Sequence, residues 1–429
     1  MQQIGEVVQS ILGVGAVAIL PIMILILGVF FRMKFMNALK AGLLVGIGFQ
    51  GVKLVVSFLV TTLNPVIQHY AASGSGFTII DVGWETLSAA AWATKFAAIF
   101  VPAGLILNFV LIRFKWIKTL NVDVWNYWHL LKSAAILSLI LMLMGITGIA
   151  NYAISFVFGL ILTVLIEKVG DLIAPYWQKY FGLEGTTCTT ILQLAGTLPI
   201  AIVVDKVIDK IPGINKINVS YEAVGERIGE FANPTIIGAI LGAFLGILTG
   251  QSIAVIIQIA VGLAAAITLT PRMVKLFMEG ISPISTAARD YMIKRLGPDA
   301  QFNIGVDIAL GVGDQTVITA SAIMIPISIL IAFIFPGNKF FPVAFFGSSL
   351  LYAMATISMV TKGNIFRSLI CGALYMCFCF FAFNFTAPLA TQFVASSGVI
   401  EVAAGSMVNA GGMNNFVDML LALLAVMVI

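Results

Sequence analysis

Two aspartates, Asp307 and Asp314, lie in a glycine-rich polar segment that directly precedes an apolar run long enough to cross a membrane. Ionisable side chains at membrane depth are costly and usually mark a pathway or a binding site. The first half of the chain repeats the pattern, because Asp81-Val-Gly-Trp84 precedes an apolar run with a proline at 102, as Asp307 precedes Pro326. Broken helices at matching positions of two halves indicate the site of a repeat-built transporter.

Two further stretches offer groups that suit a neutral polyhydroxy ligand. Glu184 is followed by threonines at 186, 187, 189 and 190, a set that either binds hydroxyls or caps the start of a helix. The segment from Asn121 to His129 mixes aromatic and polar side chains. It is typical either of an aromatic belt at the membrane interface or of a sugar-binding wall.

Composition places these residues in a polytopic membrane protein. Of 429 residues, 60% are hydrophobic and 10% are charged, and the mean hydropathy is +1.07. No basic, aromatic-interleaved patch supports nucleic-acid binding. Three of the four cysteines, Cys371, Cys377 and Cys379, share one apolar run with packing character, and Cys188 stands apart. We therefore expect no metal site and no cofactor.

Apolar runs predict about eleven membrane crossings. They lie at about 10–31, 41–63, 92–112, 130–148, 150–168, 234–250, 251–270, 315–335, 342–360, 368–386 and from 416 to the last residue. Lys and Arg collect in alternate connections, which places the N-terminus outside and the C-terminus in the cytoplasm.

The same rule makes 184–208 a re-entrant element and gives the two halves, about 10–168 and 234–386, inverted topology within one transporter domain spanning 1–429. The segments 209–230 and 272–300 become cytoplasmic loops. Within the second loop, basic and apolar residues alternate at helical spacing over 272–296. That pattern favours a helix on the inner membrane surface over a solvated loop.

Several motifs resemble the galactitol-type membrane subunit, enzyme IIC (EIIC), of the bacterial sugar phosphotransferase system, within the ascorbate–galactitol superfamily. The matching segments run in order along nearly the whole chain: KAGLLVGIGFQG (40–51), DVGW (81–84), NVDVWNYWHL (121–130), PIAIVVDKVIDKIPGINKI (199–217), TPRMVKLFMEGISPI (270–284), PGN (336–338) and KGNIFR (362–367).

The resemblance implies an all-α sugar or polyol transporter of the bacterial inner membrane that works as a homodimer. A scaffold part and a substrate-carrying core with two re-entrant hairpins would move by an elevator mechanism. The implied partner is the cytoplasmic enzyme IIB, itself loaded by IIA, whose phosphocysteine phosphorylates the sugar. The chain alone would then be a transport subunit and not an enzyme.

Carried over onto this sequence, the hairpins are 81–88 and 307–315. The predicted substrate-binding residues are Asp81, Trp84, His129, Glu184, Thr187, Thr190, Asp307, Asp314 and Gln315. Either Asp314 or His129 would accept the proton of the sugar hydroxyl. The chain departs from the family pattern in having Asp314 where a His is usual, and Thr-Thr-Cys-Thr-Thr after Glu184-Gly185 in place of a Pro-His-Gly-type run. Both departures fall at the expected site, so a different sugar or polyol is compatible with the family.

Two other functions compete on the residues alone. A transporter driven by H⁺ or Na⁺ would use Asp81, Asp307 and Asp314 as its ion site. An intramembrane aspartyl protease would use Gly311-Val-Gly-Asp314, which spells a GxGD motif, but it needs a second aspartate in a Tyr-Asp pair that the chain lacks.

Overall fold

A computed structural model describes residues 16–72, 76–121, 123, 126–221, 234–296, 302–342, 345, 349–402 and 404–428. The first residues of the first expected span, the second part of the loop 209–230 and the end of the loop 272–300 lie outside these ranges.

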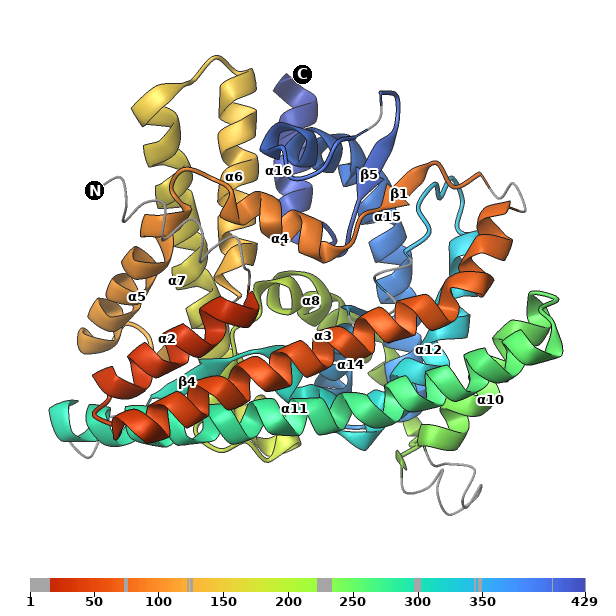
Figure 1. Cartoon of the computed structure of the whole chain (residues 1–429), viewed down its shortest axis with the longest axis horizontal. Coiled ribbons are helices and arrows are strands. Elements are labelled where there is room, and N and C mark those ends of the chain that lie inside the picture. Colours follow the sequence, from red (N-terminus) through yellow and green to blue (C-terminus); the bar gives the residue numbers. More distant parts are fainter. Residues whose placement is uncertain are drawn as a thin grey trace.

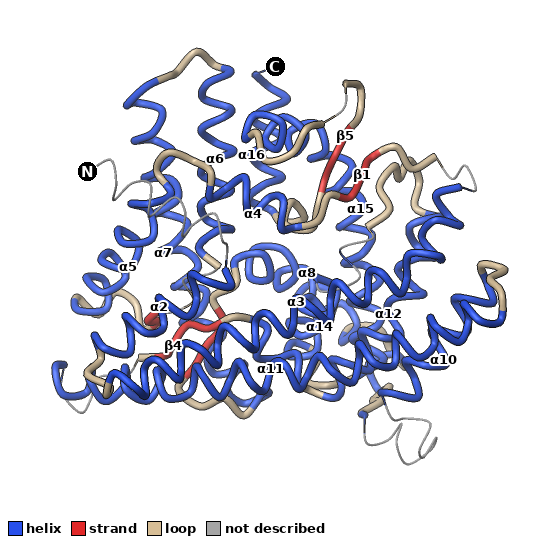
Figure 2. The backbone as a smooth tube through the Cα atoms, viewed as in Figure 1, coloured by secondary structure: helices blue, strands red, loops and turns tan. Residues whose placement is uncertain are grey.

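Helices build almost all of the described structure, as the apolar runs predict (Figures 1 and 2). In chain order they are α2 (Ala16–Phe30), α3 (Phe35–Ala72), α4 (Trp84–Trp92), α5 (Ala97–Arg113), α6 (Tyr127–Leu143), α7 (Gly148–Phe181), α8 (Leu198–Asp209), α10 (Pro234–Leu248), α11 (Ile253–Leu296), α12 (Gln315–Ile334), α14 (Ser349–Val360), α15 (Ile365–Ser397) and α16 (Phe416–Val428). Three of them, α7, α12 and α15, are long and apolar enough to cross a membrane. The all-α membrane class is therefore confirmed.

Four helices form a layer across one side of the molecule. In Figure 1, α2, α3, α10 and α11 run across the lower part, while α6, α7, α15 and α16 stand steeply to them. Small residues let the helices of the layer approach closely. A Cβ on Gly242 of α10 would lie 2.6 Å from the Ile259 carbonyl oxygen of α11, and one on Gly280 of α11 would lie 2.6 Å from the Ala41 carbonyl oxygen of α3.

Residues 272–296 are helical, as the sequence pattern favours, but they continue α11 without a break after the expected span at 251–270. The packing of α11 on α3 extends along both stretches and explains the continuity. Gly262 of α11 faces the Thr62 side chain, and Met273, in the expected surface helix, faces Gly51. Because α11 contacts α3 along both stretches, a break in the helix near residue 271 would lose packing contacts.

Five short strands break the helical pattern within the described ranges, and the sequence did not predict them. β1 (Ile79–Asp81) pairs in parallel with β5 (Met407–Asn409), and β4 (Asn303–Val306) lies between β2 (Thr119–Asn121) and β3 (Thr186–Cys188), also in parallel. Unwound backbone at membrane depth must satisfy its hydrogen bonds within the protein. Pairing the broken segments with one another meets that requirement.

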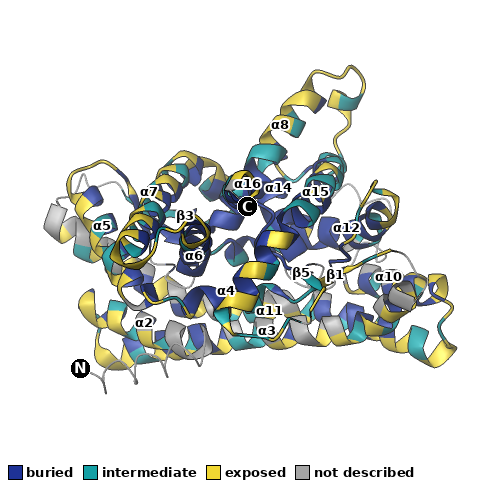
Figure 3. Ribbon diagram, turned by 90° about the horizontal axis from the view of Figure 1, so that it is seen from above, coloured by how far each residue is buried: buried dark blue, intermediate teal, exposed yellow. Residues whose placement is uncertain are grey.

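Most of the strands lead into a helix, and they therefore fix where those helices begin. A helix runs on from β3 through the π-helical turn η1 (Gln193–Thr197) into α8, which projects from the body in Figure 3. After β4 comes the 3-10 turn η4 (Ile308–Gly313), then α12. The carboxyl ends of parallel strands point the same way, so the residues that follow them gather at one place.

Candidate functional site

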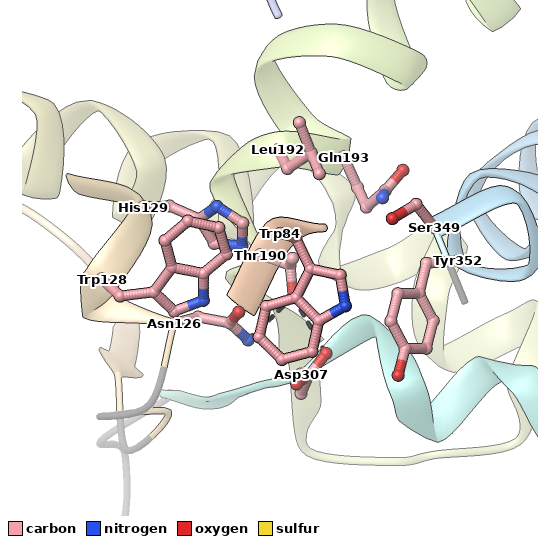
Figure 4. A pocket seen from close by; sticks show the side chains of 10 residues that line it. All are labelled: Trp84, Asn126, Trp128, His129, Thr190, Leu192, Gln193, Asp307, Ser349 and Tyr352. Atoms are coloured by element: carbon pink, nitrogen blue, oxygen red, sulfur yellow. Dashed lines mark hydrogen bonds between the residues drawn. The ribbon is translucent and has the colours of Figure 1, made fainter. Parts of the chain in front are cut away.

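A pocket lies where several helices begin (Figure 4). Its unoccupied space, with the open mouth included, is about 470 Å³. Its lining consists of Trp84, Asn126, Trp128, His129, Thr190, Leu192, Gln193, Asp307, Ser349 and Tyr352.

Strand and helix ends bring these side chains together. Asn126 is the residue before α6, Thr190 directly precedes the helix that contains η1, and Asp307 is the N-cap of η4. Trp84 and Ser349 are the first residues of α4 and α14. The first turns of helices carry backbone N–H groups without intrahelical partners, so such a pocket is rich in donors.

A chain of hydrogen bonds runs along one wall of the pocket. The Thr190 hydroxyl donates to Asp307 Oδ1 over 3.3 Å and accepts from the backbone N–H of Ile308 over 2.9 Å. Asn126 donates from its amide to Thr190 Oγ1 over 3.3 Å and also to the carboxylate of Asp123. As the N-cap of η4, Asp307 accepts through Oδ1 from the Ala309 N–H over 3.0 Å. This polar wall holds a carboxylate, an amide and a hydroxyl in fixed orientations.

Aromatic rings line another part of the pocket. The rings of Trp84 and Trp128 stack with centroids 5.9 Å apart and planes inclined by 26°. The His129 ring lies 3.8 Å from Trp128, and Figure 4 places both beside Asn126. Flat rings pack against the C–H faces of a carbohydrate or polyol, whose hydroxyls need acceptors and donors such as those of the polar wall.

His129 has an open hydrogen-bonding position. The side chain is buried, and its Nδ1 has no partner among the described residues. Buried polar nitrogens are normally paired, so an unpaired one beside a pocket suits a ligand hydroxyl.

Of the nine predicted site residues, the structure brings four to this pocket: Trp84, His129, Thr190 and Asp307. Three of the others lie outside the pocket lining and make hydrogen bonds within the protein. Asp81 Oδ1 accepts from the Gly83 N–H over 3.0 Å before α4, and Thr187 is buried and donates to the Gly170 carbonyl over 2.7 Å. Asp314 caps α12 through the Val317 N–H and accepts from the Tyr180 hydroxyl over 3.1 Å.

The remaining two predicted residues, Glu184 and Gln315, are exposed and lie outside the pocket lining. The hairpin expected at 307–315 is interrupted by η4, which separates Asp307 at its start from Asp314 at its end. One of the two carboxylates therefore reaches the pocket and the other does not.

Six lining residues were not among those nine. Asn126 and Trp128 belong to the aromatic and polar segment before α6, whose composition does suggest a ligand wall. Gln193 is a single polar residue in an apolar run, and it lies at a π-helical turn, a feature frequent at functional sites. Leu192, Ser349 and Tyr352 carry no signal in the sequence.

These features define a class: a polytopic helical membrane protein whose pocket suits a small, neutral, polar ligand. Comparison with known proteins narrows it. The chain belongs to the EIIC-GAT family of PTS system sugar-specific permease components, whose family model matches residues 10–405. PTS denotes the phosphotransferase system, so the family resemblance carried by the sequence motifs is confirmed.

Two relatives from Escherichia coli K12 illustrate the similarity. The PTS galactitol-specific EIIC component is 34% identical over 408 residues, covering 94% of this chain and 87% of the relative. A protein named as a permease IIC component is 30% identical over 411 residues, covering 94% of this chain and 90% of the relative. Both alignments cover nearly the whole chain.

Proposed function

We propose that this membrane permease subunit of the phosphotransferase system binds a polyol, galactitol or a close analogue, in the pocket between Trp84 and Asp307. The observation that carries the proposal is the pairing of stacked tryptophans with a hydrogen-bonded carboxylate, hydroxyl and amide in one lining. The name of the galactitol-specific relative supports the substrate class.

The lining is suited to a neutral ligand. Among the described residues that line the pocket, Asp307 carries the carboxylate and none is a lysine or arginine. The other polar groups are two amides, three hydroxyls, two indole N–H groups and an imidazole. A carboxylate accepts hydrogen bonds from hydroxyls and would repel an anionic sugar acid. A polyol satisfies these groups without leaving a buried charge unpaired.

Phosphorylation would follow with the enzyme IIB partner, which IIA reloads. The S–P bond of the IIB phosphocysteine breaks, the cysteine leaves as a thiolate, and a bond forms between phosphorus and the substrate hydroxyl oxygen. The hydroxyl proton must pass to an acceptor. His129 lines the pocket and has an unpaired Nδ1, so it is placed for that role better than Asp314, which lies outside the lining and whose carboxylate is engaged by Tyr180 and Val317. This chain would orient the substrate and take the proton.

The ion-driven alternative loses support. It needs Asp81, Asp307 and Asp314 in one cation site, yet only Asp307 lines the pocket, and Asp81 sits on the β1–β5 sheet. Among the described residues, no group of three or more His, Cys, Asp or Glu side chains is arranged to hold a metal ion.

We also propose the inverted-repeat architecture, with about eleven crossings, an external N-terminus and a cytoplasmic C-terminus in the bacterial inner membrane. Asp81 ends β1 and Asp307 follows β4, and each precedes a short broken segment and then a helix that contains a proline, α5 or α12. In a homodimer that works by an elevator mechanism, the layer of α2, α3, α10 and α11 would be the scaffold.

The experiment is a ligand screen on the purified protein in detergent. Sugars and polyols, galactitol included, are tested for thermal stabilisation, because a ligand that binds only the folded state raises its stability. Hits are repeated on Trp84→Leu and Asp307→Asn. The proposal expects a polyol to raise Tm in the wild type and to give a smaller shift at the same concentration in both variants. A panel without any polyol hit, or hits whose full shift both variants retain, would overturn it.

A further inference from the structure

A buried ion pair links the helix that carries the pocket wall to the end of the chain. Lys132 of α6 and Asp418 of α16 form the pair, and both side chains are at most 1% exposed. Lys132 Nζ also donates to the Gly412 carbonyl over 2.6 Å. Asp418 accepts from Ser133 Oγ over 2.8 Å and from the Asn415 amide over 2.5 Å. The network ties α6, the loop 410–415 and α16 together.

Such a pair is costly, which makes its position informative. Taking two charges out of water is unfavourable, and apolar residues of similar size often stabilise a fold as well or better. Lys132 and Ser133 stand one helical turn after Trp128 and His129, on the same side of α6. Ser133 Oγ also contacts the His129 carbonyl over 3.3 Å. The pair therefore fixes the turn of α6 that supplies two lining residues.

The loop 410–415 that this network holds touches both sides of the pocket wall. Gly412 has φ of 122°, in the region that favours glycine, and a Cβ there would lie 3.3 Å from Trp128 Cη2. On the other side, a Cβ on Gly196 of η1 would lie 2.8 Å from the Asn414 carbonyl oxygen. Gln193, a lining residue, is in the same turn η1. The loop therefore packs against Trp128 on one side and against η1, which carries Gln193, on the other.

We infer that Lys132 and Asp418 are positioning residues, whose ion pair holds the loop 410–415 between Trp128 and η1 and thereby sets the shape of the polyol pocket. The inference rests on the proposed function for its ligand. It assigns a role in substrate binding to the C-terminal segment 407–418, none of whose residues lines the pocket.

The test replaces the pair by apolar residues. Lys132→Met with Asp418→Leu removes both charges, so no unpaired charge remains buried and the protein is expected to fold with a Tm close to that of the wild type. Lys168→Met is the matched control, because it removes a lysine from the half-exposed pair with Asp171 on α7, away from the pocket. Titration calorimetry gives the polyol Kd for each protein.

A second measurement, by ¹⁹F NMR, does not need a ligand. Tryptophan is replaced by 5-fluorotryptophan, and the ¹⁹F resonance of Trp128 is assigned by its loss in Trp128→Phe. The inference expects the double variant to shift this resonance and to raise Kd about tenfold or more, since small misplacements of contact groups have effects of that size. The control should change neither.

The outcomes separate the two proposals. A wild type that binds no polyol sinks the proposed function, and the Trp128 resonance still decides whether the ion pair positions the wall. A double variant with a lowered Tm, an unmoved Trp128 resonance and an unchanged Kd would make the pair a purely structural feature and overturn the inference. If the double variant does not fold, Ser133→Ala with Asn415→Leu takes its place, because it loosens the same network without removing charges. The polyol Kd and the Trp128 resonance are then measured in the same way.

Discussion

Replacing Asp307 by Asn is the sharpest single perturbation of the proposed site, because it removes the charge and little else. Asparagine is as good an N-cap as aspartate, so η4 should keep its cap through the Ala309 N–H. The side chain keeps its shape and its hydrogen bond from Thr190. What changes is the second oxygen, Oδ2, which becomes an amide NH2 group, so that a charge-assisted bond accepted from a substrate hydroxyl is replaced by a neutral bond donated to it.

The size of the effect follows from counting acceptor positions. A carboxylate offers about four. The Ala309 N–H and the Thr190 hydroxyl both donate to Asp307 Oδ1, which leaves room at Oδ2 for a substrate hydroxyl. A hydrogen bond to a charged group contributes about 1.5–3 kcal/mol and a neutral one about 0.5–1.5 kcal/mol. The expected loss is about 1–2 kcal/mol, a rise in Kd of about 5–30-fold.

The assay is titration calorimetry with the polyol selected by the thermal screen, and Asp314→Asn is the matched control. Asp314 is also an N-cap, at the other end of η4, and lies outside the pocket lining. Asp314→Asn should leave Kd within about twofold of the wild type, because substitutions without a contact to the ligand usually have small effects. Equal losses in the two variants, or no loss in Asp307→Asn, would refute the assignment of Asp307.

Three further predictions separate binding, folding and phosphoryl transfer. Trp84→Leu should raise Kd by about 2–12-fold, from a stacking contribution of about 0.5–1.5 kcal/mol, and calorimetry would contradict this with an unchanged Kd. Thr187→Ala should lower the free energy of unfolding by about 1–2 kcal/mol, since the Gly170 carbonyl loses its donor, and should leave Kd unchanged; a change in Kd with no fall in Tm would place Thr187 at the ligand. His129→Gln should slow IIB-dependent phosphorylation by about a hundredfold or more while the polyol still binds, and a normal rate would exclude His129 as the proton acceptor.

The sequence predicts the helices well and the strands not at all. Apolar runs of about twenty residues are a strong signal, and α7, α12 and α15 fall where they indicate. The strands are only three or four residues long, too short for a period-two pattern to emerge. Their pairing joins segments such as 79–81 and 407–409, which are distant in the chain.

The same physics explains why the site could be predicted only in part. A carboxylate at a broken helix end is favoured there whether or not it binds a ligand, because it caps free N–H groups. Asp307 and Asp314 are both caps, and only the structure separates the one in the pocket from the one facing Tyr180. The Lys132–Asp418 pair joins residues 286 positions apart, which no local pattern could have indicated.

The most direct test of the account is the fate of a radiolabelled polyol in proteoliposomes that contain the purified chain and are loaded with phosphorylated IIB. The account predicts that the label accumulates inside as a phosphate ester, that uptake stops when IIB is omitted, and that Asp307→Asn reduces it at low substrate concentration. Accumulation of unmodified polyol that needs no IIB and stops when an imposed H⁺ or Na⁺ gradient is dissipated would contradict it.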